Sequence, residues 1–320
     1  MSGFTRRSFL VGSALAASGL ALPAGAALPQ SGKQGPGVYR YKLGDYQLTA
    51  LYDGTWFFKI DDKFVRNVSG SIVKRAQAAA FLKPRIVPIS FTALLVNTGS
   101  KLVLIDTGSA GQITNTAGYL NANLAATGID PGAIDLILIS HFHPDHINGI
   151  KTKDGAKIFT NAEILVPEPE WKFWMDDANM SRAKGPVLRY FRNARRIFTD
   201  IAKEVRPFTP GTEVAPGIVS VAAFGHTPGH TAFAIHSGSQ SMLAMSDTAR
   251  EPWLFVRHPE WQPSYDMDGP QAVDTRKAML DRAAADRMLV EAYHFPFPAC
   301  GHIAKSGNGY ELVPTMWNPL

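Results

Sequence analysis

The part of the chain that is expected to fold begins with segments in which apolar and polar residues alternate. Residues 38–43 and 46–52 both follow this two-residue period, which is typical of half-buried β-strands. Two more strands are predicted at 91–97 and 101–105, because the Thr-Gly-Ser sequence at 98–100 is a turn signal. The first part of the chain is therefore predicted to be mainly β-structure.

The next segments alternate between helical and strand patterns. Residues 117–126 are predicted to form a helix that stops at Gly128. Residues 134–139 are almost wholly apolar, which is typical of a strand covered on both faces. The stretch 168–205 is rich in Trp, Arg and Ala and is predicted to be mainly helical.

The last third of the chain returns to strands before another helix. Strands are predicted at 218–222, 232–236 and 241–245, followed by a helix at 271–285 and a strand at 287–293. Strands followed by a helix in each half favour two sheets with helices on the outside. We therefore predict an α/β protein, an αββα sandwich of two mixed β-sheets flanked by helices.

The composition is that of an ordinary globular protein. The chain has 320 residues, of which 45% are hydrophobic and 18% charged, so it is too apolar to be disordered. A chain of this length buries a substantial core without disulfides, and Cys300 has no second cysteine to pair with. The formal net charge of +5 is mild and no basic cluster accompanies it, so no nucleic-acid partner is predicted.

The first residues resemble a twin-arginine export signal. Arg6 and Arg7 precede Phe-Leu and a mildly apolar run at 11–21, and small residues at 24–26 form a cleavage signature. A membrane anchor is the alternative, but the run is short and is interrupted by two glycines and a proline. Export is therefore favoured, and cleavage would lower the net charge by two.

These features set the predicted boundaries. We predict an export signal at 1–26, a linker at 27–37 and a single catalytic domain at 38–320. The expected location is the periplasm or the exterior of the cell, reached through the twin-arginine export machinery.

Metal-binding side chains are concentrated directly after the apolar strand at 134–139. His141, His143, Asp145 and His146 fall within six residues, and imidazole and carboxylate groups are ligands suited to zinc and similar ions. A loop leaving a strand can aim alternate side chains at two adjacent points. His141 and His143 are predicted to hold one ion. Asp145 and His146 are predicted to hold a second. A purely structural origin for such a cluster is rare.

This His-x-His-x-Asp-His motif resembles the signature of the metallo-β-lactamase superfamily. The other motifs of the family appear in the expected order: Asp-Thr-Gly at 106–108, Gly-His-Thr-Pro-Gly-His-Thr at 225–231 and Ser-Asp-Thr at 246–248. The resemblance covers nearly everything after the signal. It implies the αββα fold, His230 as the third histidine ligand, and Asp247 as the carboxylate that bridges two ions.

The last ligand has two candidates. His302 follows Gly301 in a turn typical of the family and is preferred over His294, which ends a predicted strand and is expected to line the pocket or support a ligand. His226 is expected to stabilise its own turn. Asp106 is expected to hold the metal loop by hydrogen bonds rather than to act in catalysis.

The resemblance implies two divalent ions, with zinc as the first choice and manganese, cobalt or iron as alternatives. The ions would share a water or hydroxide that attacks the substrate. Asp247 would fix their separation and Asp145 would orient the water or relay its proton, so these two are the predicted catalytic residues. The segment at 293–303 resembles that of methyl parathion hydrolase-like enzymes, which implies lactones, aryl esters or phosphotriesters as substrates.

Three residues narrow the activity within the family. Asp247 argues against a β-lactamase, and His143 argues against the oxygen chemistry of di-iron relatives. Arg250 stands where acyl-homoserine lactonases have a tyrosine, which argues against a standard lactonase of that group. An apolar, aryl-bearing substrate fits the aromatic residues near the predicted ligands, which are Trp253, Phe255, Phe295 and Phe297.

Two other functions remain as alternatives. A thioester hydrolase of the glyoxalase II kind shares the ligands, although the export signal and the lack of a basic glutathione-binding tail count against it. A metal-binding protein without catalysis is the second alternative. The expected partner is a small-molecule ester, lactone or phosphotriester, and a homodimer is compatible with the resemblance.

Overall fold

The computed structural model describes residues 31–318 and Leu320. The export signal predicted at 1–26 and the first residues of the predicted linker, 27–30, lie outside the described residues. Pro36–Leu320 forms one compact unit. Within the described part of the chain, no helix is long and apolar enough to cross a membrane.

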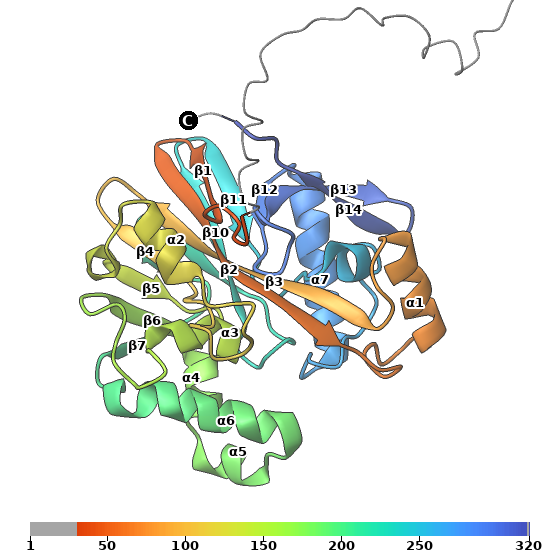
Figure 1. The fold of residues 1–320 in the computed structure, drawn as a ribbon, viewed down its shortest axis with the longest axis horizontal. Helices are drawn as coiled ribbons and strands as arrows, with labels where there is room; N and C mark the ends of the chain where they lie inside the picture. The colour runs from red at the N-terminus through yellow and green to blue at the C-terminus, as the bar shows by residue number, and fades with distance from the viewer. Residues whose placement is uncertain (1–30, 319) are drawn as a thin grey trace, which may run out of the picture. The chain divides into compact units, whose positions relative to one another are not determined.

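Two seven-stranded sheets make up this unit (Figure 1). The first sheet follows chain order, with strands β1 (Val38–Leu43), β2 (Tyr46–Lys59), β3 (Ile86–Asn97), β4 (Leu102–Ile105), β5 (Leu136–Leu138), β6 (Glu163–Pro167) and β7 (Val205–Phe208). Strands β1 to β4 pair antiparallel, and β4 to β7 pair parallel. The carboxyl ends of the parallel strands share one edge, where the loops of α/β proteins bind ligands.

The second sheet also follows chain order, from β8 to β14. Its strands are β8 (Glu213–Ala215), β9 (Ile218–Ala222), β10 (Thr231–Ser237), β11 (Gln240–Ala244), β12 (Leu289–Glu291), β13 (Cys300–Ser306) and β14 (Gly309–Pro314). Strands β11 and β12 pair parallel, and the remaining neighbours pair antiparallel. Both sheets are therefore mixed, as predicted.

The α-helices surround the two sheets or lie in the loops at their edges (Figure 1). They are α1 (Gly70–Ala79), α2 (Leu120–Ala126), α3 (Pro144–Ile147), α4 (Glu168–Trp174), α5 (Asp177–Arg182), α6 (Gly185–Phe198) and α7 (Gly269–Ala285). Helices α4, α5 and α6 contact one another beside β6 and β7, whereas α7 packs against β13.

The apolar side chains form separate layers, which is what a sandwich requires. The layer between the sheets contains residues of both, including Leu48, Leu94, Phe233 and Met242. A second layer, with Trp174, Phe191 and Phe198, covers the first sheet, and a third, with Leu280 and Val290, covers the second. The predicted αββα sandwich is confirmed.

The structure contains elements that were not predicted, including helix α1, strands β6, β7 and β8, and the hairpin of β13 and β14. Strand β2 continues past the predicted end at residue 52, because a β-bulge between Tyr52 and Gly54 keeps it paired with β3. Gly54 has a φ of 143°, and an added Cβ would lie 2.3 Å from Ala117 Cα, so this bulge requires glycine.

Candidate metal centre

Asp106, at the end of β4, holds the loop that follows β5. Its Oδ1 accepts a hydrogen bond from Ser140 N at 2.8 Å, and its Oδ2 accepts one from Ser140 Oγ at 2.7 Å. Oδ2 also lies 2.8 Å from His146 Nδ1. Because an ionised carboxylate only accepts, His146 carries a proton on Nδ1 and directs Nε2 elsewhere.

Three imidazole rings and one carboxylate converge in the first of two groups. His143 Nδ1 lies 3.0 Å from His141 Nε2 and 2.9 Å from His226 Nε2, and Asp247 Oδ2 lies 3.2 Å from His226 Nε2. All four side chains are buried. His226 Nδ1 donates to Asp266 Oδ1 at 2.9 Å, which leaves Nε2 as an acceptor facing the group. Such converging acceptors need a cation or a proton among them.

The second group consists of Asp145, His146 and His294. His294 Nδ1 donates to Ser90 O at 2.7 Å, so its Nε2 is the free acceptor. That nitrogen lies 3.5 Å from Asp145 Oδ2 and 3.1 Å from Asp247 Oδ2. His146 Nε2 lies 3.5 Å from Asp145 Oδ2. This group therefore places two ring nitrogens beside carboxylate oxygens.

Asp247, which follows β11, connects the two groups. Its Oδ1 lies 3.2 Å from His146 Nε2, while its Oδ2 faces His226 and His294. Arg250 Nη1 donates to Oδ2 at 2.7 Å and fixes the carboxylate from the side. One buried carboxylate thus faces both sets of ring nitrogens.

The protonation of the rings follows from their surroundings. Burial lowers the pKa of His141 and of His143 well below the usual value, so both rings are neutral at neutral pH, the form that binds a metal. Burial also lowers the pKa of His146, but the carboxylates of Asp247 and Asp106 outweigh it and hold that pKa well above the usual value. A metal ion in the second group must therefore displace a proton.

The donor set fits divalent metal ions. Within each group, the candidate ligand atoms lie within 4.8 Å of one another. Buried atoms without a hydrogen-bond partner cluster here: His143 Nε2, His146 Nε2 and Asp247 Oδ1. Buried polar atoms are rarely left unpaired, and imidazole nitrogen and carboxylate oxygen are preferred zinc ligands. The arrangement can hold metal ions in both groups.

The structure places His230, the predicted third histidine ligand, in neither group. Its Nδ1 donates to Ala223 O at 3.0 Å, and its Nε2 accepts from Asp247 N at 3.1 Å. Burial lowers its pKa to about 3, so the ring is neutral and both nitrogens are committed to the backbone. His226, expected only to stabilise the turn, is the histidine of this motif that stands in the first group.

Of the two candidates for the last ligand, the structure places His294, and not the preferred His302, in the second group. His302 lies on β13, opposite Leu289, with an exposed side chain and its Nδ1 3.0 Å from Met288 O. It belongs to neither group. His294 is fully buried and is the histidine that the structure places beside Asp145.

Glu170, in the first turn of α4, was missed by sequence reasoning. Its Oε2 accepts from Phe142 N at 3.0 Å and from Trp174 Nε1 at 2.7 Å, and its Oε1 accepts from Gly229 N at 2.7 Å. One buried carboxylate therefore links the loop of His141 and His143 to the loop of His226. An acidic residue in the first turn of a helix is common, so the sequence holds no signal for this role.

A second missed contact lies behind His226. Arg276 of α7 is buried and donates from Nη2 to Asp266 Oδ2 at 2.9 Å and from Nε to Thr248 O at 3.0 Å. Asp266 in turn accepts from His226. Helix α7 thereby supports a ring of the first group through two charged side chains.

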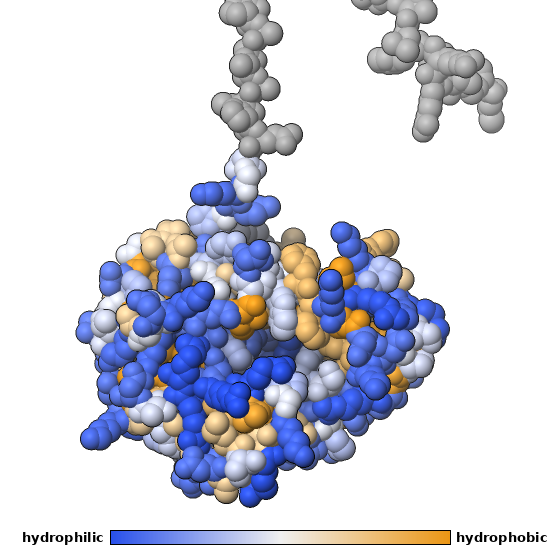
Figure 2. Space-filling model, turned by 60° about the horizontal axis from the view of Figure 1, so that its bottom comes forward, coloured by the Kyte–Doolittle hydropathy of each residue, from blue (hydrophilic) through white to orange (hydrophobic). Residues whose placement is uncertain are grey.

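A cavity of about 780 Å³ opens beside the metal centre and is bordered by His143, Asp145 and Arg250. The face of the molecule in Figure 2 is hollowed near its centre, with hydrophilic and hydrophobic residues around the hollow. Its aromatic wall consists of Trp56, Phe58, Phe91, Tyr190 and Tyr265. These are not the aromatic residues expected from the sequence, since none of Trp253, Phe255, Phe295 and Phe297 lines this cavity.

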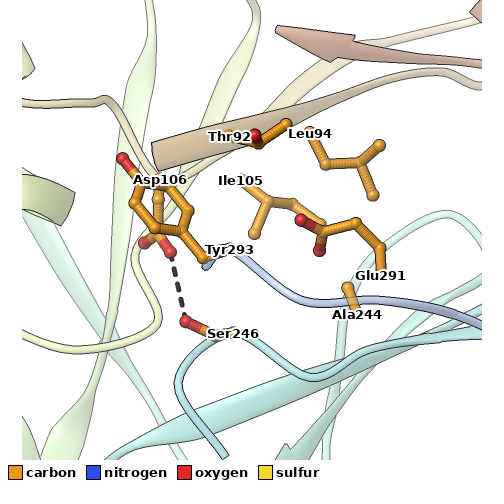
Figure 3. Close-up of a pocket in the computed structure, with 8 residues that line it drawn as sticks. All are labelled: Thr92, Leu94, Ile105, Asp106, Ala244, Ser246, Glu291 and Tyr293. Carbon is orange, nitrogen blue, oxygen red and sulfur yellow. Dashed lines mark hydrogen bonds between the residues drawn. The ribbon is translucent and has the colours of Figure 1, made fainter. Parts of the chain in front are cut away.

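A much smaller cavity, of about 10 Å³, lies between the sheets, and Asp106 is one of the residues that line it (Figure 3). Glu291 and Thr92 line it, and Glu291 Oε1 and Thr92 Oγ1 have no hydrogen-bond partner. Burial, followed by the charge of Asp106, raises the pKa of Glu291 well above its usual value. The space is about that of one water molecule.

Comparisons with known proteins agree with this architecture. The family model of the metallo-beta-lactamase superfamily matches residues 89–291. The chain is similar to the hydrolase AbOPH of the beta lactamase superfamily, with 29% identity, a TM-score of 0.84 and coverage of 90% of this chain and 100% of that one. It is also similar to AidC, a dizinc quorum-quenching lactonase, with 26% identity, a TM-score of 0.82 and coverage of 88% and 99%. A probable metal-dependent hydrolase from Staphylococcus aureus shares the fold, with 22% identity, a TM-score of 0.70 and coverage of 86% and 100%.

Proposed function

The chain belongs to the metallo-beta-lactamase superfamily, and from this premise we propose that it is a binuclear metal-dependent hydrolase of lactones, aryl esters or phosphotriesters. One observation carries the proposal: the carboxylate of Asp247 lies between two groups of buried histidines. A carboxylate shared in this way is suited to holding two ions at a fixed separation. The cavity beside it provides room for a substrate.

The proposed ligands divide into two sets that share Asp247. The first set is His141, His143 and His226, and the second is Asp145, His146 and His294. Zinc suits both sets, and manganese, cobalt and iron are the alternatives. When bound, divalent ions lower the pKa of a water molecule and polarise an oxygen of the substrate.

Asp145 is the proposed acceptor of the proton that the attacking water loses. Its side chain is 15% exposed, whereas that of Asp247 is fully buried. It also borders the large cavity, so it can contact both water and substrate. The Asp247 carboxylate accepts from Arg250, and the Asp247 backbone N–H donates to His230 Nε2, which suits a positioning role.

The substrate class follows from the wall of the cavity. Aromatic and aliphatic side chains make up much of it, which suits an ester with an apolar part. AidC, a lactonase solved with N-hexnoyl-L-homoserine, supports lactones as a first candidate. Phosphotriesters stay in the proposal because attack on phosphorus needs the same activated water as attack on a carbonyl carbon.

Export remains part of the proposal. The twin-arginine-like segment at 1–26 supports transport to the periplasm or the exterior. A homodimer is proposed only on the family resemblance, and size-exclusion chromatography with light scattering would test it.

The test compares substrates on protein loaded with zinc or manganese. Dihydrocoumarin, an acyl-homoserine lactone, methyl paraoxon and a glutathione thioester would be assayed together with the metal content. We expect two ions per chain and turnover of at least one of the first three substrates. Asp247→Ala should lose both ions and activity. Turnover of the thioester alone would support the glyoxalase II alternative, and metal binding without turnover would contradict the proposal.

A further inference from the structure

Three tyrosines lie against the rings of the metal centre, and they differ in what their hydroxyl groups do. Tyr293 donates to Asp145 O at 2.7 Å, and Tyr265 donates to Glu251 Oε2 at 3.1 Å. Tyr190 makes no hydrogen bond to any residue that the structure describes, and it lines the large cavity. It is therefore the one of these three phenols that is free to bind a ligand.

The ring of Tyr190 is held in place from two sides. Its centroid lies 4.7 Å from that of His143 and 6.5 Å from that of Trp174. The neighbouring Phe191 is buried in the core and anchors this turn of α6. The phenol is thus fixed at the cavity wall, beside a proposed ligand, without being part of the ligand groups.

The Tyr190 hydroxyl faces the large cavity with its proton free to donate, because no described residue accepts from it. A neutral phenol donates a hydrogen bond but does not take a proton from an attacking water, a task that Asp145 can perform. Its natural partner is an oxygen atom that becomes negative during the reaction.

We propose that Tyr190 binds the leaving oxygen of the substrate and stabilises it by a hydrogen bond as the ester bond breaks. This inference rests on the proposed ester hydrolysis. In the step, the water oxygen forms a bond to the carbonyl carbon and the bond from that carbon to the leaving oxygen breaks. The proton that the water loses ends on the leaving oxygen. Tyr190 keeps its own proton throughout.

This role predicts that loss of the Tyr190 hydroxyl affects substrates with different leaving groups to different extents. An alkyl leaving oxygen, as in an acyl-homoserine lactone, develops a full negative charge and depends on a donor. A 4-nitrophenyl leaving oxygen spreads its charge over the ring and depends on one far less. A donor to the leaving oxygen therefore matters for alkyl lactones, whereas a residue that only packs against His143 affects both substrates alike.

Tyr190→Phe tests this while keeping the aromatic ring in place. We expect kcat/KM for an acyl-homoserine lactone to fall roughly 10- to 100-fold and that for a 4-nitrophenyl ester to fall less than about 3-fold. Tyr119→Phe, at an exposed tyrosine outside the cavity, is the matched control and should change neither value. Metal content and the melting temperature should stay unchanged in both variants, since neither hydroxyl contacts a ligand group.

The outcomes separate this inference from the proposed function. Wild-type protein that turns over no ester contradicts the proposed function and the role of Tyr190 with it. Active wild-type protein with equal losses on both substrates, or with no loss, contradicts the role of Tyr190 alone. A binding measurement adds a second readout: the hydroxy-acid product, which retains the former leaving oxygen, should bind Tyr190→Phe about 10-fold more weakly than wild type.

Discussion

Asp266 Oδ1 and His226 Nδ1 are joined by a hydrogen bond of 2.9 Å, and this contact decides which nitrogen of His226 faces the metal centre. A carboxylate fixes the proton on Nδ1 and orients the ring. We expect Asp266→Asn to lower zinc affinity about 10- to 100-fold. The amide can donate to Nδ1, and the proton of the neutral ring then moves to Nε2, the nitrogen that faces the metal centre. Competition with a chelator would measure this, and Asp281→Asn, at an exposed site, is the control. Unchanged affinity in Asp266→Asn would mean that the proton on Nδ1 does not depend on Asp266.

The histidines near the C-terminus give a matched pair of variants. His294→Ala removes a ring beside Asp145 and should reduce the metal content from two ions per chain to one. His302→Ala removes an exposed ring from β13 and should leave two ions bound. Elemental analysis of the purified variants reads out both results. Loss of an ion from His302→Ala alone would restore the expectation drawn from the sequence.

His226 and His230 should separate metal binding from stability. His226→Ala should lose an ion, whereas His230→Ala should keep both ions but unfold more easily without them, because Ala223 O and Asp247 N lose their partners. The unsatisfied groups would cost about 1–3 kcal/mol each. Urea unfolding of the metal-free proteins, combined with metal analysis, measures both effects. The reverse pattern would make His230 the ligand.

Glu170 should matter for the folding of the site rather than for its chemistry. Glu170→Ala leaves Phe142 N, Gly229 N and the Trp174 indole without their acceptor, so we expect a loss of roughly 3 kcal/mol or more in the free energy of unfolding. Glu168→Ala, in the same turn but only partly buried and paired with Lys172 at the surface, should change little. Equal stability of the two variants in urea would show that other groups or water take over the contacts of Glu170.

Glu291 predicts a pH dependence of stability. Because its pKa is raised in the folded state, the folded protein binds a proton that the unfolded chain releases above a pH of about 4.3. This contribution makes folding less favourable as the pH rises from the pKa of the unfolded chain toward the raised pKa of the folded protein. Glu291→Gln removes the effect, so the variant should gain stability over wild type at pH 8 but not at pH 4.

Unfolding of the metal-free proteins at both pH values measures this difference. The exposed Glu311→Gln is the control and should follow wild type at each pH. Parallel pH profiles of Glu291→Gln and wild type would contradict the buried, protonated state of Glu291.

The features of this structure that depend on local sequence pattern could be predicted. The apolar strand before His141 and the close spacing of His143, Asp145 and His146 are visible along the chain, so the motif and the fold class were predicted. The orientation of each histidine ring toward the metal centre, in contrast, depends on residues far away in the sequence. His226 and His230 share one motif, and the difference lies in two hydrogen bonds to the backbone of Ala223 and Asp247.

The remaining differences arise from contacts over long distances in the chain. His294 and His302 are both near the end of the second sheet, and the turn between them decides which one enters the site. Glu170 and Asp266 act through hydrogen bonds to distant loops, so their residue types alone gave no indication. The cavity wall draws Trp56 and Phe58 from the extension of β2 beyond its predicted end.

The division of the chain into two consecutive seven-stranded sheets has a consequence for the metal centre. Strands β1 to β7 and the residues His141 to His146 precede position 209, whereas His226, Asp247 and His294 follow it. Each proposed ion therefore takes ligands from both halves. A fragment ending after β7 and a fragment starting at β8 would each hold only part of either ligand set. We therefore expect the two fragments to associate more tightly when divalent metal is present than when it is absent.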